Sequence, residues 1–234
     1  MLKFLGRGSA FTDTQNCAYF EQDGALVLLD CPMSAFHALR RHGIPQKQIF
    51  VLVTHTHSDH VGGIPMLIHF ARYIADAMVT VVAPSVEVAE DLQYLIERLD
   101  GCDPTAYAMI TADALHAAWF VGAVPVRHIP ALAGRCFGYR LCVNGTNVLY
   151  TGDAAELEPF LPYLHNGAYL YTEIANFDSG VHMYIDTVLP ELRRLTAEGV
   201  HIYLMHLDDE PALAEKMKGV GIDFAPLFSE NAGL

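Results

Sequence analysis

The sequence has few basic residues, which limits the partners that the protein can bind. Only 14 of its 234 residues are lysine or arginine, against 27 aspartates and glutamates, so the formal net charge is -13. Binding of long nucleic acid needs clustered cations that neutralise phosphates, and we expect no such partner. A small anionic substrate remains compatible with this charge, because bound metal ions would dominate the local field.

Cysteines and long apolar runs are also scarce. There are only five cysteines, none in a Cys-x-x-Cys pair, which argues against a disulfide framework or a structural zinc knuckle and predicts buried thiols in strands. The most apolar stretch, residues 61–74, contains Pro65, His69 and Arg72 and is too short and too polar to cross a bilayer. The apolar part of the first residues is too short for a signal peptide, so we expect a cytoplasmic protein without membrane association.

Short apolar runs alternate with helical patterns over the whole length, and we see no repeat or long linker. The predicted strands are Leu2–Leu5, Cys17–Glu21, Ala25–Asp30, Phe50–Thr54, Val79–Ala83, Ala118–Val121, Val124–Ile129, Cys136–Val143, Val148–Thr151, Tyr169–Glu173 and Ile202–His206. The predicted helices are Ser34–His42, Gly63–Ala77, Ser85–Leu99, Glu156–Leu164, Thr187–Ala197 and Pro211–Lys218. This order favours a single α/β domain over residues 1–234, built as a four-layer α/β/β/α sandwich.

The segment that carries most functional information is the run from His55 to His60, with the sequence His-Thr-His-Ser-Asp-His. It follows a buried strand, and imidazole and carboxylate groups at a strand end are suitable ligands for zinc and its neighbours. His55 and His57 point the same way in extended backbone and can share one ion. Asp59 and His60 lie past the bend and can turn to a second ion. A polar surface loop with chance histidines is the less favoured alternative.

This His-x-His-x-Asp-His run resembles the signature of the metallo-β-lactamase superfamily. Further resemblances follow in order along the chain: the opening segments 5–10 and 28–31, the Gly-Asp pair that ends at Asp153, and the late strand that ends at His206. The opening segments are similar to those of the ribonuclease Z-like and phosphodiesterase branches. By analogy with the family, a homodimer is also expected.

The resemblance implies a complete set of metal ligands. His55, His57 and His128 would hold a first divalent ion, Asp59, His60 and His206 a second, and Asp153 would be shared. The assignment of His128 is less direct, because the usual spacing before Gly138-Tyr139-Arg140 falls on Leu132, which cannot bind metal; we read 132–135 as part of a longer loop. The alternative is that His128 is an ordinary strand histidine and the first ion has fewer protein ligands. Zinc fits the ligands best, with manganese or iron as alternatives.

The expected chemistry is hydrolysis by a water activated between the two ions, which Asp59 would both help to bind and orient. The segment 171–177 and His182 resemble a Glu/His pair of ribonuclease Z and related phosphodiesterases. By that resemblance Glu173 would hold His182, which would protonate the leaving oxygen or grip a phosphate. The alternative is a structural glutamate and a histidine that happens to start a helix.

We therefore expect a binuclear metal-dependent phosphodiesterase that acts on a small or cyclic nucleotide-like phosphodiester. Ribonuclease Z-like cleavage of RNA is the second hypothesis, because no basic arm that could grip tRNA is visible in the sequence. Hydrolysis of a carboxylic or sulfuric ester is the third. A metal-binding sensor without turnover is a different class, which a bridging carboxylate argues against.

Overall fold

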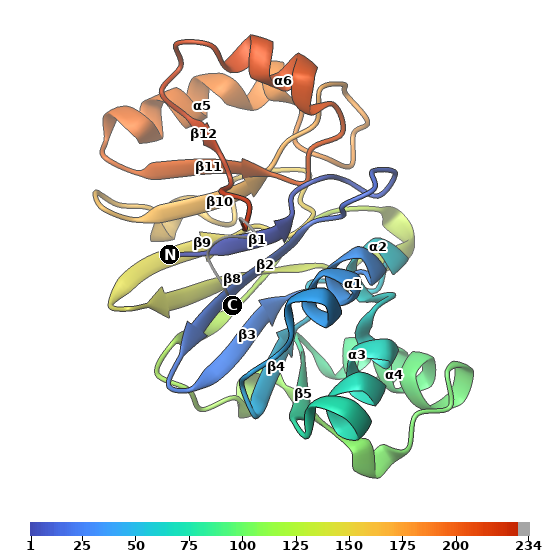
Figure 1. Cartoon of the computed structure of the whole chain (residues 1–234). Coiled ribbons are helices and arrows are strands. Elements are labelled where there is room, and N and C mark those ends of the chain that lie inside the picture. Colours follow the sequence, from blue (N-terminus) through green and yellow to red (C-terminus); the bar gives the residue numbers. More distant parts are fainter. Residues whose placement is uncertain (229–234) are drawn as a thin grey trace.

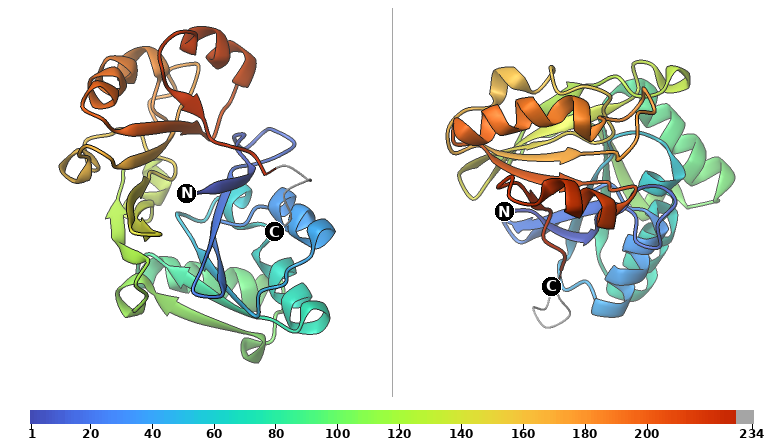
Figure 2. Two further views of the ribbon diagram at one scale, coloured as in Figure 1. Left: turned by 60° about the vertical axis from the view of Figure 1, so that its left-hand side comes forward. Right: turned by 90° about the horizontal axis from the view of Figure 1, so that it is seen from above.

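The computed structural model describes residues 1–228, so the last six residues of the predicted domain, 229–234, lie outside the described part. Two six-stranded sheets face each other, and helices cover the outer face of each sheet (Figures 1 and 2). The predicted four-layer α/β/β/α sandwich is confirmed.

The first sheet has the strand order β1-β2-β3-β4-β5-β6. Strands β1, β2 and β3 pair antiparallel, whereas β3 to β6 pair in parallel. Their bounds are β1 (Lys3–Gly6), β2 (Cys17–Gln22), β3 (Ala25–Leu29), β4 (Gln48–Leu52), β5 (Met78–Ala83) and β6 (Tyr107–Thr111). All five side chains of β3 are buried, as expected for a parallel strand covered on both faces.

The second sheet has the strand order β12-β11-β10-β9-β8-β7. Here β7, β8 and β9 pair antiparallel, and β9 to β12 pair in parallel. Their bounds are β7 (Phe120–Pro125), β8 (Phe137–Val143), β9 (Thr146–Tyr150), β10 (Tyr169–Glu173), β11 (His201–Met205) and β12 (Asp223–Phe224).

Helices pack on the outside of both sheets. Helix α1 (Met33–His42), α3 (Ile64–Phe70) and α4 (Val86–Gln93) cover the first sheet, and α5 (Ile185–Ala197) and α6 (Glu210–Met217) cover the second (Figure 1). The short helix α2 (Ser58–Val61) precedes α3, and the π-helical turns η1 (Ala71–Ala75) and η2 (Tyr94–Leu99) extend α3 and α4. The 3-10 turns are η3 (Pro104–Ala106), η4 (Ala112–Ala114), η5 (Pro130–Leu132) and η6 (Leu161–Tyr163).

The buried apolar residues form three clusters, which correspond to the three interfaces between the four layers. One cluster lies between the first sheet and its helices, one between the second sheet and its helices, and the third joins the two sheets. The third contains Phe4, Tyr139, Tyr150 and Tyr171, all at most 1% exposed. No helix in residues 1–228 is long and apolar enough to cross a membrane.

Three sequence predictions about elements were wrong. The predicted helix 156–164 is a series of turns with only η6, because Pro159 and Pro162 lack the amide hydrogens that a helix needs. The predicted strands 118–121 and 124–129 are one strand, β7, with a register shift near Gly122. Strands β6 and β12 were missed because β6 is mostly half-buried without clear alternation and β12 has only two residues.

Candidate metal centre

The candidate ligands that the first sheet contributes follow β4 directly. Strand β4 ends at Leu52, two residues before the predicted end, because the Thr54 amide donates to the side chain of Asp30 at 2.7 Å instead of to a strand. His55 and His57 lie on the connecting loop, and Asp59 and His60 lie in α2 rather than in the predicted loop. The helix turns Asp59 and His60 away from the direction of the strand.

The first group of side chains consists of His55, His57, His128 and Asp153, whose ligand atoms all lie within 4.8 Å of one another. Nε2 of His55 is 2.9 Å from Nδ1 of His57, and Nε2 of both His55 and His128 is 3.8 Å from Oδ2 of Asp153. Burial lowers the pKa of each of the three histidines. Neutral imidazoles are the form that binds a metal ion.

The second group consists of Asp59, His60 and His206, again within 4.8 Å of one another. Oδ2 of Asp59 is 3.3 Å from Nε2 of His60 and 3.5 Å from Nε2 of His206. His206 directly follows β11 and has a φ of 52°. This is a strained conformation for a residue with a side chain, and such strain persists where the surrounding structure holds the residue in place.

Asp153 lies between the two groups. Its Oδ1 is 3.4 Å from Nε2 of His60, and its Oδ2 is 3.4 Å from Nε2 of His206 and faces the histidines of the first group. Gly152 brings Asp153 to this position with a φ of 60°, and a Cβ there would lie 2.7 Å from the carbonyl oxygen of Phe137. Only glycine meets both conditions without strain.

The unpaired polar atoms of the site fit metal ions. Nε2 of His60, Nε2 of His206 and Oδ1 of Asp153 are buried and have no hydrogen-bond partner among the described residues. An unsatisfied buried polar atom is costly, and native structures rarely keep several together without a ligand. Divalent metal ions bound by these atoms would remove the cost, so the donor set fits the predicted cofactor.

Asp30 is a candidate positioning residue that the sequence analysis did not identify. Its carboxylate accepts hydrogen bonds from the amide and hydroxyl of Thr54 and lies 2.8 Å from Nδ1 of His60. A carboxylate on the far nitrogen fixes the tautomer of a ligand histidine and directs Nε2 into the site. Burial raises the pKa of Asp30, although the His60 and Thr54 contacts oppose this. The available signal was an aspartate that directly follows a fully apolar strand.

Glu173 and His182 form a pair beside both groups. Nδ1 of His182 is 2.5 Å from Oε2 of Glu173, and the other oxygen of Glu173 accepts from the amide of Ala154. The His182 ring lies 4.8 Å from the His128 ring and 5.3 Å from the His206 ring, measured between centroids. Burial raises the pKa of Glu173 to about 7; burial lowers the pKa of His182, but Glu173 outweighs this and raises it to about 9.

The structure brings His128 into the first group from a loop beyond the end of β7, not from a strand. Its Nδ1 lies 2.9 Å from the carbonyl oxygen of Val181, which leaves Nε2 free to face Asp153. His128 also lines a cleft of about 500 Å³ whose other walls include Ile129, Pro130 and Val181. The site therefore adjoins a mainly apolar cavity of small-molecule size.

Comparison with known proteins agrees with this fold. The fold resembles that of the metallo-β-lactamase fold protein YhfI from Bacillus subtilis, with a TM-score of 0.75 and 20% identity over 96% of this chain and 95% of that one. It also resembles human tRNase Z, short form, with a TM-score of 0.66 and 16% identity over 97% of both chains. The metallo-β-lactamase fold that the sequence resemblance implied is confirmed, and the prediction of a metal-dependent hydrolase agrees with this fold.

Two relatives carry the same name, anti-Pycsar protein Apyc1. The protein from Paenibacillus xerothermodurans is 28% identical over 229 residues, which cover 89% of this chain and 88% of that protein. The protein from Saccharibacillus brassicae is 47% identical over 66 residues, and the match spans only 27% of each chain. The model of the family described as anti-Pycsar protein Apyc1 matches residues 1–225. The chain therefore belongs to the anti-Pycsar protein Apyc1 family.

Proposed function

We propose that this chain is a binuclear metal-dependent phosphodiesterase that hydrolyses small, cyclic nucleotide-like phosphodiesters. The observation that carries the proposal is the convergence of two groups of candidate ligands around Asp153, next to the Glu173/His182 pair. It also accords with membership of the anti-Pycsar family.

In this proposal, one ion is held by His55, His57 and His128, and the other by Asp59, His60 and His206. Asp153 is shared by both ions. Zinc fits this set of imidazoles and carboxylates, and manganese or iron are alternatives. When bound, two divalent ions supply Lewis acidity toward a phosphoryl oxygen and an activated water as nucleophile.

Protein side chains supply the remaining steps. The carboxylate of Asp59 accepts a proton or hydrogen bond from the attacking water and so orients it. His182 donates a proton to the leaving oxygen, or hydrogen-bonds a phosphate oxygen, from its position between the His128 and His206 rings. Glu173 fixes the tautomer and the orientation of His182 through Nδ1, because a carboxylate can only accept at that nitrogen.

Charge and cavity size support a small substrate. The cleft beside His128 has a volume of about 500 Å³. This lies within the range of small-molecule sites. Its apolar walls suit the face of a flat base or another apolar group. The net charge of -13 opposes the approach of a long polyanion.

The proposal is tested by measuring turnover of purine and pyrimidine 3′,5′-cyclic nucleotides with added zinc or manganese, with the nucleoside monophosphate product identified by chromatography. Bis(p-nitrophenyl) phosphate tests general phosphodiesterase activity, p-nitrophenyl acetate tests esterase activity, and a precursor tRNA tests ribonuclease activity. We expect cyclic nucleotides to be preferred and His57→Ala to be inactive. Turnover of the acetate or the tRNA alone, or no turnover with both metal positions filled, would contradict the proposal.

A further inference from the structure

A second set of metal-ligating side chains lies outside the centre described above. His69 on α3 meets Asp100 and Cys102 on the loop that follows η2, and their ligand atoms lie within 4.8 Å of one another. The sequence analysis had no role for His69 in this context and expected Cys102 to be a buried strand thiol. Cys102 is a free thiol, buried at 3% exposure, but it lies on a loop.

The three ligand atoms have the spacing of one face of a zinc tetrahedron. Nε2 of His69 is 3.3 Å from Sγ of Cys102 and 3.5 Å from Oδ2 of Asp100, and Sγ of Cys102 is 3.7 Å from that oxygen. Zinc–ligand bonds at tetrahedral angles predict separations of about 3.6, 3.4 and 3.6 Å for these pairs. A single cation can therefore contact all three atoms with little rearrangement.

The local backbone holds the three side chains in this arrangement. Gly101 has a φ of 76° and turns the chain between Asp100 and Cys102, so that both side chains face α3. Glycine adopts such a positive φ without steric cost. The amides of Asp100 and Cys102 donate to the carbonyl oxygens of Leu95 and Ile96, which fixes the turn on the end of η2. The His69 ring stacks on Tyr73, which restrains its orientation.

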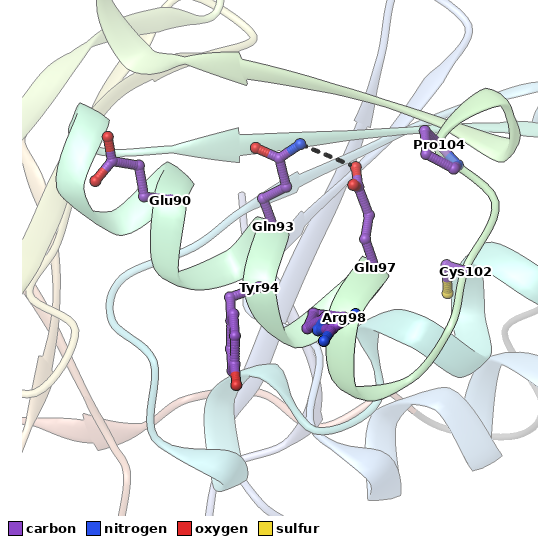
Figure 3. Close-up of a pocket in the computed structure, with 7 residues that line it drawn as sticks. All are labelled: Glu90, Gln93, Tyr94, Glu97, Arg98, Cys102 and Pro104. Carbon is purple, nitrogen blue, oxygen red and sulfur yellow. Dashed lines mark hydrogen bonds between the residues drawn. The ribbon is translucent and has the colours of Figure 1, made fainter.

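The triad is accessible from solvent. Cys102 lies at the edge of an open cleft of about 660 Å³, which is lined by α4, η2, the following loop and the start of η3 (Figure 3). The side chains of His69 and Asp100 are 34% and 41% exposed. A hydrated cation can therefore reach the three ligands, and solvent can fill the remaining coordination position.

We propose that His69, Asp100 and Cys102 bind one further divalent ion of the zinc class, separate from the two at the strand ends. Imidazole, carboxylate and thiolate together favour zinc or cobalt over magnesium or calcium. The Cys102 thiol releases its proton to solvent on binding, since the thiolate is the ligand. The ion joins α3 to the loop after η2, two segments 33 residues apart in sequence.

Cobalt distinguishes this site from the other one, because no cysteine of the described residues belongs to the strand-end groups. The metal-free protein is titrated with Co²⁺ while the thiolate-to-cobalt charge-transfer absorption in the near ultraviolet and the bound cobalt per chain are recorded. The variants are Cys102→Ser, His69→Gln and, as matched control, Cys142→Ser, which removes a half-buried thiol of β8.

We expect the wild type and Cys142→Ser to show the band and to bind one cobalt ion more per chain than Cys102→Ser. His69→Gln replaces a partly exposed side chain, leaves no buried cavity, and should weaken cobalt binding at the thiolate by at least tenfold. This variant decides the question if Cys102→Ser does not fold. Absence of the band in cobalt-saturated wild type, or an unchanged titration in His69→Gln, would overturn the proposal.

Discussion

The two sheets contribute to the strand-end site in different ways. The first sheet presents four candidate ligands from six consecutive residues, 55–60, on one loop and the start of one short helix. The second sheet contributes single residues, His128, Asp153 and His206, each from the end of a different strand. One half of the site is therefore a local motif, and the other half exists only because strands that run in the same direction end at the same edge of a sheet.

The largest effect is expected from the residue that joins the two halves. Asp153→Ala removes the carboxylate that faces both groups of candidate ligands. Hydrolysis of a phosphodiester should therefore fall by roughly 10³-fold or more in kcat/KM, the equivalent of several kcal/mol of Lewis-acid stabilisation. Bound metal per chain, measured by mass spectrometry, should fall at the same time. An Asp153→Ala variant with full metal content and wild-type turnover would show that Asp153 does not join the two halves of the site.

A smaller effect should follow from loss of His182, the proposed general acid. His182→Ala should lower kcat about 10²-fold for substrates with alkoxide leaving groups, the lower range for general acid catalysis. Bis(p-nitrophenyl) phosphate should be much less affected, because its leaving group needs no proton. Glu173→Gln serves as the matched variant, since it keeps His182 but removes the carboxylate that orients the ring and raises its pKa. Equal losses for both leaving groups would contradict the role as acid.

On the first sheet, Asp30→Asn tests the positioning of His60. The change keeps the size of the side chain but weakens its hydrogen bond with Nδ1 of His60. Metal affinity should fall about 10–100-fold, as for other partners of ligand histidines. Chelator competition measures the affinity directly, and kcat at saturating metal should change little. If affinity is unchanged while kcat falls, Asp30 acts on the reaction and not on the ligand.

The last prediction concerns the stability of the turn that positions Asp153. Gly152→Ala introduces a Cβ at positive φ, 2.7 Å from a carbonyl oxygen. This should lower the free energy of unfolding by roughly 2–5 kcal/mol. Gly145→Ala is the control, because its φ is also positive but nothing lies within 4 Å of the added Cβ. The control should cost about 1–2 kcal/mol. Urea denaturation of both variants measures the difference; equal costs would mean that the close approach at Gly152 is relaxed easily.

The comparison of the two sheets also explains how much the sequence could predict. The run 55–60 was recognisable by itself because its spacing matches the geometry of one strand end. Asp153 and His206 were found only through their resemblance to a family, since a Gly-Asp pair or a lone histidine carries no local signal. The sandwich followed from the alternation of strands and helices, but the edge strand β6 was missed because its side chains are mostly half-buried.

Contacts between segments far apart in sequence were beyond the reach of local patterns. Asp30 precedes His60 by 30 residues, and only the parallel pairing of β3 with β4 brings its carboxylate to the imidazole. Cys102 and His69 meet for a similar reason, because the loop that follows η2 contacts α3. No role could be assigned to Asp30 or Cys102 from the sequence, because their partners in space were unknown.

The most direct test of the binuclear centre is an anomalous-difference map from zinc-loaded crystals, recorded at the zinc absorption edge. We predict two peaks about 3.5–4 Å apart between the strand ends, with Asp153 in contact with both. A single peak there, or zinc bound away from His55, Asp59 and His206, would contradict the claim that the two sheets jointly hold a pair of metal ions.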